Sequence, residues 1–273
     1  MSVVLGVDIG GSTTKIACFE ATGERTAMLQ VEASDRLTSL YGAIGNILST
    51  NGISLGDVSR IVLTGVGASL VDSDIYGIKT EHIAEFDAIG RGGLHLSGKE
   101  EALIVSMGTG TAFIRAGQNG NSHIGGSGVG GGTLTGLAWH MFHENSYTAL
   151  AKLADKGDIN NIDLMVSDIC RSDIEQLRPH TTASNFGRVT SAATKEDLAL
   201  GLINMVFETV GMLSVFALRN DTVRDVVLIG TLAKLKLAPT ILSHVEELSD
   251  VRFLIPEDAI YATAIGAALP FLD

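Results

Sequence analysis

Runs of apolar residues separated by glycine-rich turns open the chain, and the same pattern returns at residue 102. Short apolar runs bounded by turn residues are typical of buried β-strands. In both places the first strand leads through a tight turn into a second strand. The predicted strands span residues 3–8, 14–20, 26–32, 60–64, 102–105, 111–116, 225–229 and 251–254.

Apolar positions with helical spacing lie between these strands. Predicted helices span residues 36–51, 81–97, 195–219 and 258–269, and another begins directly after the glycine loop 125–132. The helix over 195–219 is apolar nearly all round, which predicts burial between domains or between subunits. Asn204 and Glu208 interrupt it, and this argues against a membrane span.

The returning pattern is a weak internal repeat. In a chain of 273 residues it predicts two α/β domains, residues 1–100 and residues 101–273. The last predicted helix carries small residues at helical spacing, among them Ala264, Gly266 and Ala268. Small residues permit close packing, so this helix is a candidate to pack back on the first domain.

The first glycine turn has the composition of a phosphate-binding loop. Gly10 and Gly11 let backbone N–H groups approach an anion, Ser12, Thr13 and Thr14 add hydroxyls, and Lys15 adds a cation. Asp8, at the end of the preceding strand, can hold Mg²⁺ directly or through water. The turn leads into a strand and not into a helix, which excludes a P-loop or a dinucleotide-binding turn. An ordinary hairpin turn is the alternative.

The second turn, Gly108-Thr109-Gly110-Thr111, completes the pattern. Two such hairpins that face each other can hold the phosphates of a nucleotide between two domains, and this indicates phosphoryl transfer. The glycine loop 125–132 leads into a helix, whose free N–H groups would favour an anion. A flexible linker is the alternative for that loop.

Net charge, cysteine content and the N-terminal residues limit the possible ligands and the location of the protein. The formal net charge of −12 argues against binding to nucleic acid. The cysteines, Cys18 and Cys170, form neither a disulfide framework nor a CxxC metal site. No basic region precedes the first apolar run, so it is not expected to be a signal peptide, and a cytoplasmic location without membrane attachment follows.

Several motifs occur together in one order: residues 8–15, Ala84-Glu85-Phe86-Asp87-Ala88, Gly108-Thr109-Gly110-Thr111, Gly130-Gly131-Gly132 and Ala183-Ser184-Asn185-Phe186-Gly187. Together they resemble the bacterial type II pantothenate kinases, and the resemblance covers nearly the whole chain. It implies an α/β, two-domain actin-like ATPase (ribonuclease H-like) fold with an interdomain nucleotide cleft. The implied reaction is ATP-dependent phosphorylation of pantothenate to 4′-phosphopantothenate, the first step of coenzyme A biosynthesis.

The resemblance also implies roles for individual residues. Glu85 would be the general base that takes the proton of the substrate hydroxyl, with Asp87 as the alternative. The residues implied to bind ATP and Mg²⁺ are Asp8, Gly10, Gly11, Ser12, Thr13, Lys15, Thr109, Gly131, Gly132, Thr133, Leu134, Thr135, Tyr147 and Thr231. The family is a homodimer, and the helix over 195–219 would supply the interface.

Two positions depart from the family pattern on the substrate side. His123 stands where the family usually has an arginine that helps hold the acid substrate, and Ser106 replaces an asparagine. A histidine is a weaker and pH-dependent cation. A kinase for another small hydroxyl compound, such as an amino sugar or a pantothenate relative, is therefore an alternative. A non-catalytic nucleotide-binding regulator is a second alternative, and the retained Asp8, Lys15 and Glu85 argue against it.

Overall fold

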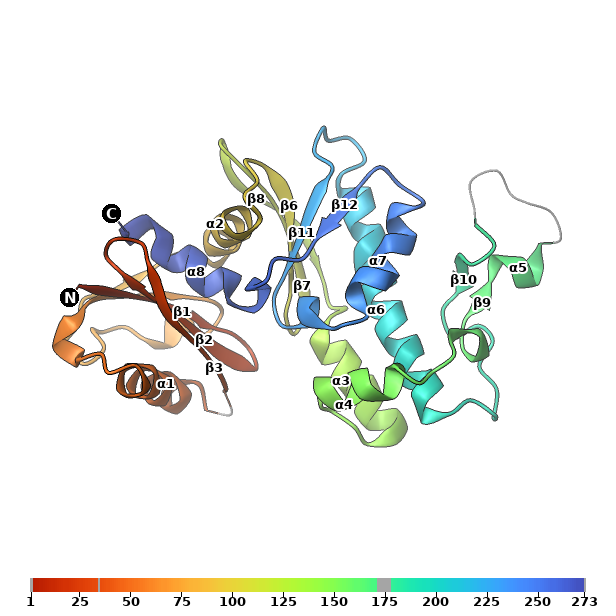
Figure 1. The fold of residues 1–273 in the computed structure, drawn as a ribbon, viewed down its shortest axis with the longest axis horizontal. Helices are drawn as coiled ribbons and strands as arrows, with labels where there is room; N and C mark the ends of the chain where they lie inside the picture. Colours follow the sequence, from red (N-terminus) through yellow and green to blue (C-terminus); the bar gives the residue numbers. More distant parts are fainter. Residues whose placement is uncertain (1, 34, 171–177, 273) are drawn as a thin grey trace.

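Two mixed sheets form the framework of the protein (Figure 1). A computed structural model describes residues 2–33, 35–170 and 178–272. The first sheet has the strand order β3-β2-β1-β4-β5 and the second has the order β12-β11-β6-β7-β8. Each sheet therefore combines three antiparallel strands, joined by hairpins, with two parallel strands on one side.

The first sheet is covered on one face by α1 (Arg36–Thr50). Its strands are β1 (Val3–Ile9), β2 (Thr13–Glu20), β3 (Arg25–Glu32), β4 (Val58–Thr64) and β5 (Thr80–His82). Asp35 begins the helix as its N-cap and accepts the Thr38 N–H at 2.8 Å. The apolar face of α1, with Leu40, Ile44 and Ile47, packs on the side chains of β1.

The second sheet is covered by helices on its outer face (Figure 1). Its strands are β6 (Ala102–Met107), β7 (Thr111–Gly117), β8 (Gly120–Ser127), β11 (Asp225–Ile229) and β12 (Arg252–Leu254). The covering helices are α3 (Gly131–Phe142), α4 (Tyr147–Ala154), α6 (Lys195–Ala217) and α7 (Ala238–Glu246). Phe207, fully buried at the centre of α6, lies in the largest apolar cluster of this half.

Helices α2 (Glu85–Ser97) and α8 (Ala262–Ala268) lie between the two sheets (Figure 1). Helix α8 packs on β1, β2 and β4, whereas α2 packs on β6, β7, β8 and β11. The two helices cross without side chains between them: a β-carbon at Gly266 would overlap the carbonyl oxygen of Ala88, and one at Gly92 would overlap that of Ala262. A β-carbon at Gly6 on β1 would likewise overlap the carbonyl oxygen of Ala264.

Helix α6 is long and apolar enough, by length and composition, to cross a membrane, but 56% of that stretch is buried inside the fold. Its buried side contacts α3, α4 and α7 of the same chain. Near its start, a small extension of short elements lies at the end of the molecule remote from the first sheet (Figure 1). These elements are β9 (Leu164–Met165), α5 (Val166–Ile169) and β10 (Thr182–Ser184).

The predicted strand order within each hairpin is confirmed, but several predicted bounds are wrong. Residues 80–82 form β5 and not the start of a helix, because they pair in parallel with β4. Residues 125–127 belong to β8, since antiparallel pairing with β7 continues through the first glycines. The last predicted helix is a short α-helix flanked by 3₁₀ turns at 259–261 and 269–271. The proposed domain boundary at residue 100 falls between α2 and β6 and stays a prediction.

We expect Gly266→Ala to destabilise the protein by about 1–3 kcal/mol, because the new methyl group would force α2 and α8 apart. Gly45→Ala in α1 is the matched control, since nothing lies within 4 Å of its added β-carbon. Alanine favours a helix over glycine, so this control should gain up to about 1 kcal/mol. Urea unfolding of both variants measures the difference, and equal stability of the two would contradict the packing argument.

Candidate active site

The β1–β2 hairpin places a carboxylate and an ammonium group opposite each other next to its turn. Asp8 pairs with Lys15 in the antiparallel register, and Gly10 closes the turn by donating its N–H to the Thr13 carbonyl at 3.0 Å. Both side chains are buried, and the Lys15 Nζ lies 3.5 Å from the Asp8 Oδ2. Burial raises the pKa of Asp8, and the charge and hydrogen bond of Lys15 oppose that rise.

The end of β4 adds two residues beside Asp8 that the sequence analysis did not assign to the site. Thr64 pairs with Asp8 in the parallel register, and its buried Oγ1 has no hydrogen-bond partner among the residues that the structure describes. Gly65 follows with φ +88°, and a β-carbon there would lie 2.6 Å from the Asp8 Oδ1. Their position at the carboxyl end of a predicted strand parallel to β1 was the signal that could have identified them.

The two glycine turns meet directly. The Ser12 Oγ lies 2.9 Å from the Thr109 Oγ1. This hydrogen bond joins the hairpin of the first sheet to the hairpin of the second sheet. A β-carbon at Gly11 would lie 3.2 Å from the same Thr109 hydroxyl. The hypothesis that the two hairpins face each other therefore agrees with their position in the fold.

The start of α3 differs from its sequence prediction. The N–H groups of Gly131 and Gly132 are not free, because they donate to the carbonyls of Gly108 and Thr109, each at 2.8 Å. These bonds fix the helix to the second turn. A β-carbon at Gly130 would lie 2.8 Å from the Gly110 backbone, which explains why glycine occurs at this close approach.

The other residues predicted near the nucleotide occupy different environments. Leu134 is fully buried in the core, so its side chain is unavailable to a ligand, whereas Thr133 is half-buried and donates its hydroxyl to the Gly128 carbonyl at 2.8 Å. The Thr135 hydroxyl donates to the Gly131 carbonyl at 2.9 Å. Both hydroxyls thus stabilise the helix start.

Tyr147 and Thr231 also lie around this second turn. Tyr147 begins α4, and a β-carbon at Gly131 would overlap its phenolic oxygen. Burial raises the pKa of Tyr147. Thr231 follows β11, which pairs in parallel with β6 and ends beside Ser106.

Glu85 is the first residue of α2, and its neighbours in space are the charges of the first hairpin. Burial raises the pKa of Glu85, the negative charge of Asp8 raises it further, and the charge of Lys15 lowers it. Asp87 has a different environment, since its Oδ1 accepts from the Asn121 Nδ2 at 3.2 Å. Glu85 therefore lies within the electrostatic influence of Asp8 and Lys15, whereas the Asp87 carboxylate is hydrogen-bonded to Asn121.

His123 lies against the start of the same helix. Its ring stacks on Phe86, the neighbour of Glu85, with ring centroids 4.2 Å apart and planes within 3°. The side chain is exposed on β8. Ser106, at the end of β6, is half-buried, and within the described residues no hydrogen bond joins it to His123 or Glu85. Both residues belong to the second sheet, and His123 is the one that contacts the start of α2, through Phe86.

Comparison with known sequences identifies the family. The family model called Fumble matches residues 101–247. A type II pantothenate kinase of Oceanobacillus iheyensis is 30% identical over 274 residues, which cover 97% of this chain and 98% of that protein. The chain belongs to the type II pantothenate kinase family. A second member, from Staphylococcus haemolyticus, is 26% identical over 96% of this chain and 98% of its own length.

Solved structures with the same fold include more distant proteins. Component A of the (R)-2-hydroxyglutaryl-CoA dehydratase of Acidaminococcus fermentans matches with a TM-score of 0.71 at 18% identity, over 99% of this chain and 97% of that one. The ROK hexokinase of Thermus thermophilus matches with a TM-score of 0.55 at 16% identity, over 98% and 97%. These likenesses confirm the predicted actin-like ATPase fold for this member of the type II pantothenate kinase family.

The raised pKa of Glu85 makes a prediction about stability. The native state holds the proton at pH values where the unfolded chain releases it, so stability falls as pH rises from the ordinary glutamate value through the raised folded value. We expect Glu85→Gln to raise Tm at neutral pH and to differ little from the native chain near about pH 4. Glu24→Gln, at an exposed turn residue, is the control. A lower Tm for Glu85→Gln at neutral pH would contradict the assigned environment.

Proposed function

We propose that this chain transfers the γ-phosphoryl group of ATP to the primary hydroxyl of pantothenate and releases 4′-phosphopantothenate and ADP. One observation carries the proposal in the structure: the first hairpin ends in the buried pair Asp8–Lys15, 3.5 Å apart, directly beside the second glycine turn. The second hairpin meets the first through Ser12 and Thr109. Membership of the type II pantothenate kinase family supports the choice of substrate.

The phosphates would lie at the joined turns. Gly10, Gly11 and the hydroxyls of Ser12 and Thr13 would surround the β- and γ-phosphates, while Lys15 neutralises developing charge. Thr109 would approach from the other side, and the hydroxyl pair Ser12–Thr109 would exchange its mutual hydrogen bond for bonds to phosphate oxygens.

Tyr147 and Thr231, near the second turn, would contact the adenosine end. Gly131 to Thr135 would shape this side, and the paired N–H groups of Gly131 and Gly132 would act only through their dipoles.

Asp8 is the residue that fits a magnesium ion. Mg²⁺ in kinases takes one or two carboxylates, with phosphate and water oxygens completing its shell. Asp8 supplies a carboxylate, and the Thr64 hydroxyl, which has no hydrogen-bond partner within the described part of the chain, lies in the paired position of the next strand. No three His, Cys, Asp or Glu side chains of the described residues form a closed metal site, which agrees with a substrate-linked ion. When bound, Mg²⁺ would neutralise phosphate charge.

Glu85 would act as the general base. As the pantothenate oxygen bonds to the γ-phosphorus, the bond to the β-phosphate oxygen breaks and the hydroxyl proton passes to the Glu85 carboxylate. A raised pKa makes this carboxylate a stronger base, provided that the pH lies above it. The activity should therefore fall at acid pH as Glu85 takes up a proton.

The assembly and location belong to the same proposal. Met205, Thr209, Met212 and Phe216 follow one side of α6 and remain partly or largely exposed, with Phe216 60% exposed. This apolar stripe supports a homodimer through α6. A cytoplasmic location is proposed because the reaction consumes ATP.

We expect Glu85→Gln to lower kcat by about 10²–10⁴-fold, the usual contribution of a positioned general base. Asp87→Asn is the matched control on the same helix turn. We expect it to retain activity within about tenfold, because the Asp87 carboxylate already accepts a hydrogen bond from Asn121. ADP release is measured with saturating ATP, Mg²⁺ and pantothenate, and circular dichroism checks folding. Loss in Asp87→Asn with retention in Glu85→Gln would reverse the assignment, and no turnover by the native chain would reject the kinase proposal.

His123 favours an alternative substrate, a small hydroxyl compound without a carboxylate. Its exposed imidazole ring is not a permanent cation and would hold the carboxylate of pantothenate only weakly. We expect His123→Arg to lower KM for pantothenate up to about fivefold, the range of an exposed ion pair. KM for pantetheine, which lacks the carboxylate, should not change. Faster turnover of pantetheine or an amino sugar than of pantothenate by the native chain would establish the alternative acceptor.

A further inference from the structure

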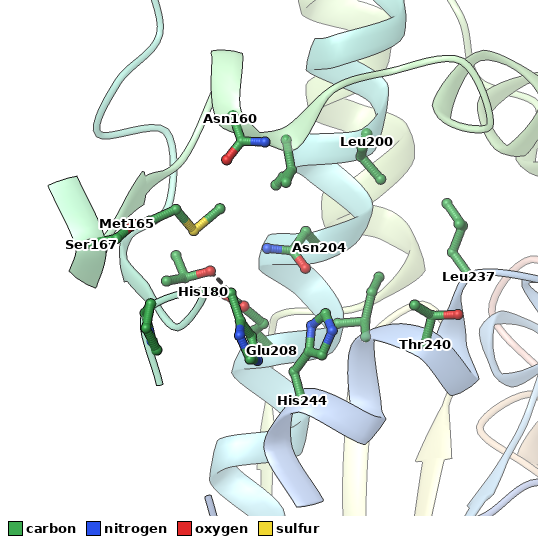
Figure 2. Close-up of a pocket in the computed structure, with 14 residues that line it drawn as sticks. Asn160, Met165, Ser167, His180, Leu200, Asn204, Glu208, Leu237, Thr240 and His244 are labelled. Atoms are coloured by element: carbon green, nitrogen blue, oxygen red, sulfur yellow. Dashed lines mark hydrogen bonds between the residues drawn. The ribbon is translucent and has the colours of Figure 1, made fainter. Parts of the chain in front are cut away.

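A cavity of about 440 Å³ lies beside α6, remote from the two glycine turns (Figure 2). Its walls come from α6, α7, the short extension β9–α5–β10 and the turn at 159–161. None of its lining residues belongs to the candidate active site. The volume is within the range of small-molecule sites.

Asn204, in the middle of α6, presents an acceptor to this cavity. Its side-chain Nδ2 donates to the Asp163 Oδ2 at 2.8 Å. Asp163 is fully buried, and its two oxygens accept three N–H groups, from Asn204, Asn185 and the Phe186 backbone. Because a carboxylate can only accept, the Asn204 nitrogen must face it, and the amide oxygen is turned to the cavity (Figure 2).

Glu208, one turn further along α6, presents a second acceptor. Its two oxygens accept from the Thr182 hydroxyl at 2.7 Å and from the Asn185 Nδ2 at 2.8 Å, and each oxygen keeps a lone pair for a further donor. Figure 2 shows the side chain on the same wall as Asn204. Asn185 thus bridges Asp163 and Glu208, which gives the Asn-Phe-Gly segment a structural role.

Glu208 places a carboxylate on the cavity wall, and Asp163 lies behind Asn204, outside the lining. Among residues 2–33, 35–170 and 178–272, neither Asp163 nor Glu208 forms an ion pair. His180, on the same wall, is held by Glu247 at 3.1 Å, and its ring lies 5.2 Å from that of His244. Buried charge without a counter-charge favours a cation in the adjoining space.

The rest of the wall is mixed: Asn160, Ser167 and Thr240 add polar groups, and an apolar part lies among them. Met165, Leu200 and Ile241 line it together with Leu237. Positions four residues apart on a helix have β-carbons about 5–6 Å apart, a gap that a single ammonium group can bridge. The acceptors of Asn204 and Glu208 therefore suit the head group of a ligand, and the apolar residues suit an alkyl part.

We propose that this cavity binds a small molecule with a primary ammonium group and a short apolar chain, separate from ATP and the phosphate acceptor. The ammonium group donates to the Asn204 Oδ1 and to the Glu208 carboxylate, and the chain contacts Met165, Leu200 and Ile241. This site does not depend on the proposed kinase reaction.

Calorimetric titration with hexylammonium chloride tests the proposal on the whole chain at moderate salt. Sodium hexanoate and hexanol have the same chain and a different head group. We expect saturable binding of hexylammonium at millimolar concentration, weaker binding of hexanol and none of hexanoate. No saturable binding of hexylammonium, or equal binding of hexanoate, would overturn the proposal.

Two variants locate the binding. Glu208→Gln keeps the shape and removes the charge, and we expect it to weaken hexylammonium binding at least about tenfold. Thr240→Phe adds a ring at an exposed lining position of α7 and should abolish binding, whereas Ser243→Phe, on the same helix but outside the lining, should leave it unchanged. Unchanged affinity in Thr240→Phe would overturn the location, and unchanged affinity in Glu208→Gln would overturn the ammonium assignment.

Discussion

The close crossing of α2 and α8 is the constraint on which the arrangement of the two halves depends. Gly92 and Gly266 let the backbones of the two helices touch, and Gly6 lets α8 lie directly on β1. Each helix belongs mainly to a different sheet, so this contact fixes the distance between the sheets. A side chain at any of the three positions would widen the joint, and packed interiors accommodate such additions poorly.

The position of the charges follows from the same crossing. Glu85 begins α2, and Asp8 and Lys15 end the hairpin that α8 covers. Holding the two helices together buries both acids, and burial is the main reason why the pKa values of Asp8 and Glu85 are raised, while the charge of Lys15 lowers both. The contact between α2 and α8 therefore consists of close backbone packing at the crossing, with the charged groups Asp8, Lys15 and Glu85 beside it.

Local signals in the sequence were sufficient for the two hairpins and for the helix that carries Glu85. Strand pairing explains the errors: Glu81, Gly125 and Gly126 have little strand propensity, and their partners in β4 and β7 decide their conformation. The pairing of the Gly131 and Gly132 N–H groups and the raised pKa of Glu85 depend on residues far along the chain. The cavity beside α6 was unpredictable for the same reason, since its acceptors are oriented by Asp163 and Asn185 from another segment.

Helix α8 has one more consequence, which concerns the order of synthesis. The face of the first sheet formed by Val4, Ala17 and Phe19 is covered by residues 264–268, which are translated more than two hundred positions later. During translation that face stays open, although every strand of the first sheet has already left the ribosome. The amino-terminal half thus reaches its final fold only after the carboxyl-terminal half is made. Until then the nascent protein exposes an apolar, aggregation-prone surface that chaperones can shield.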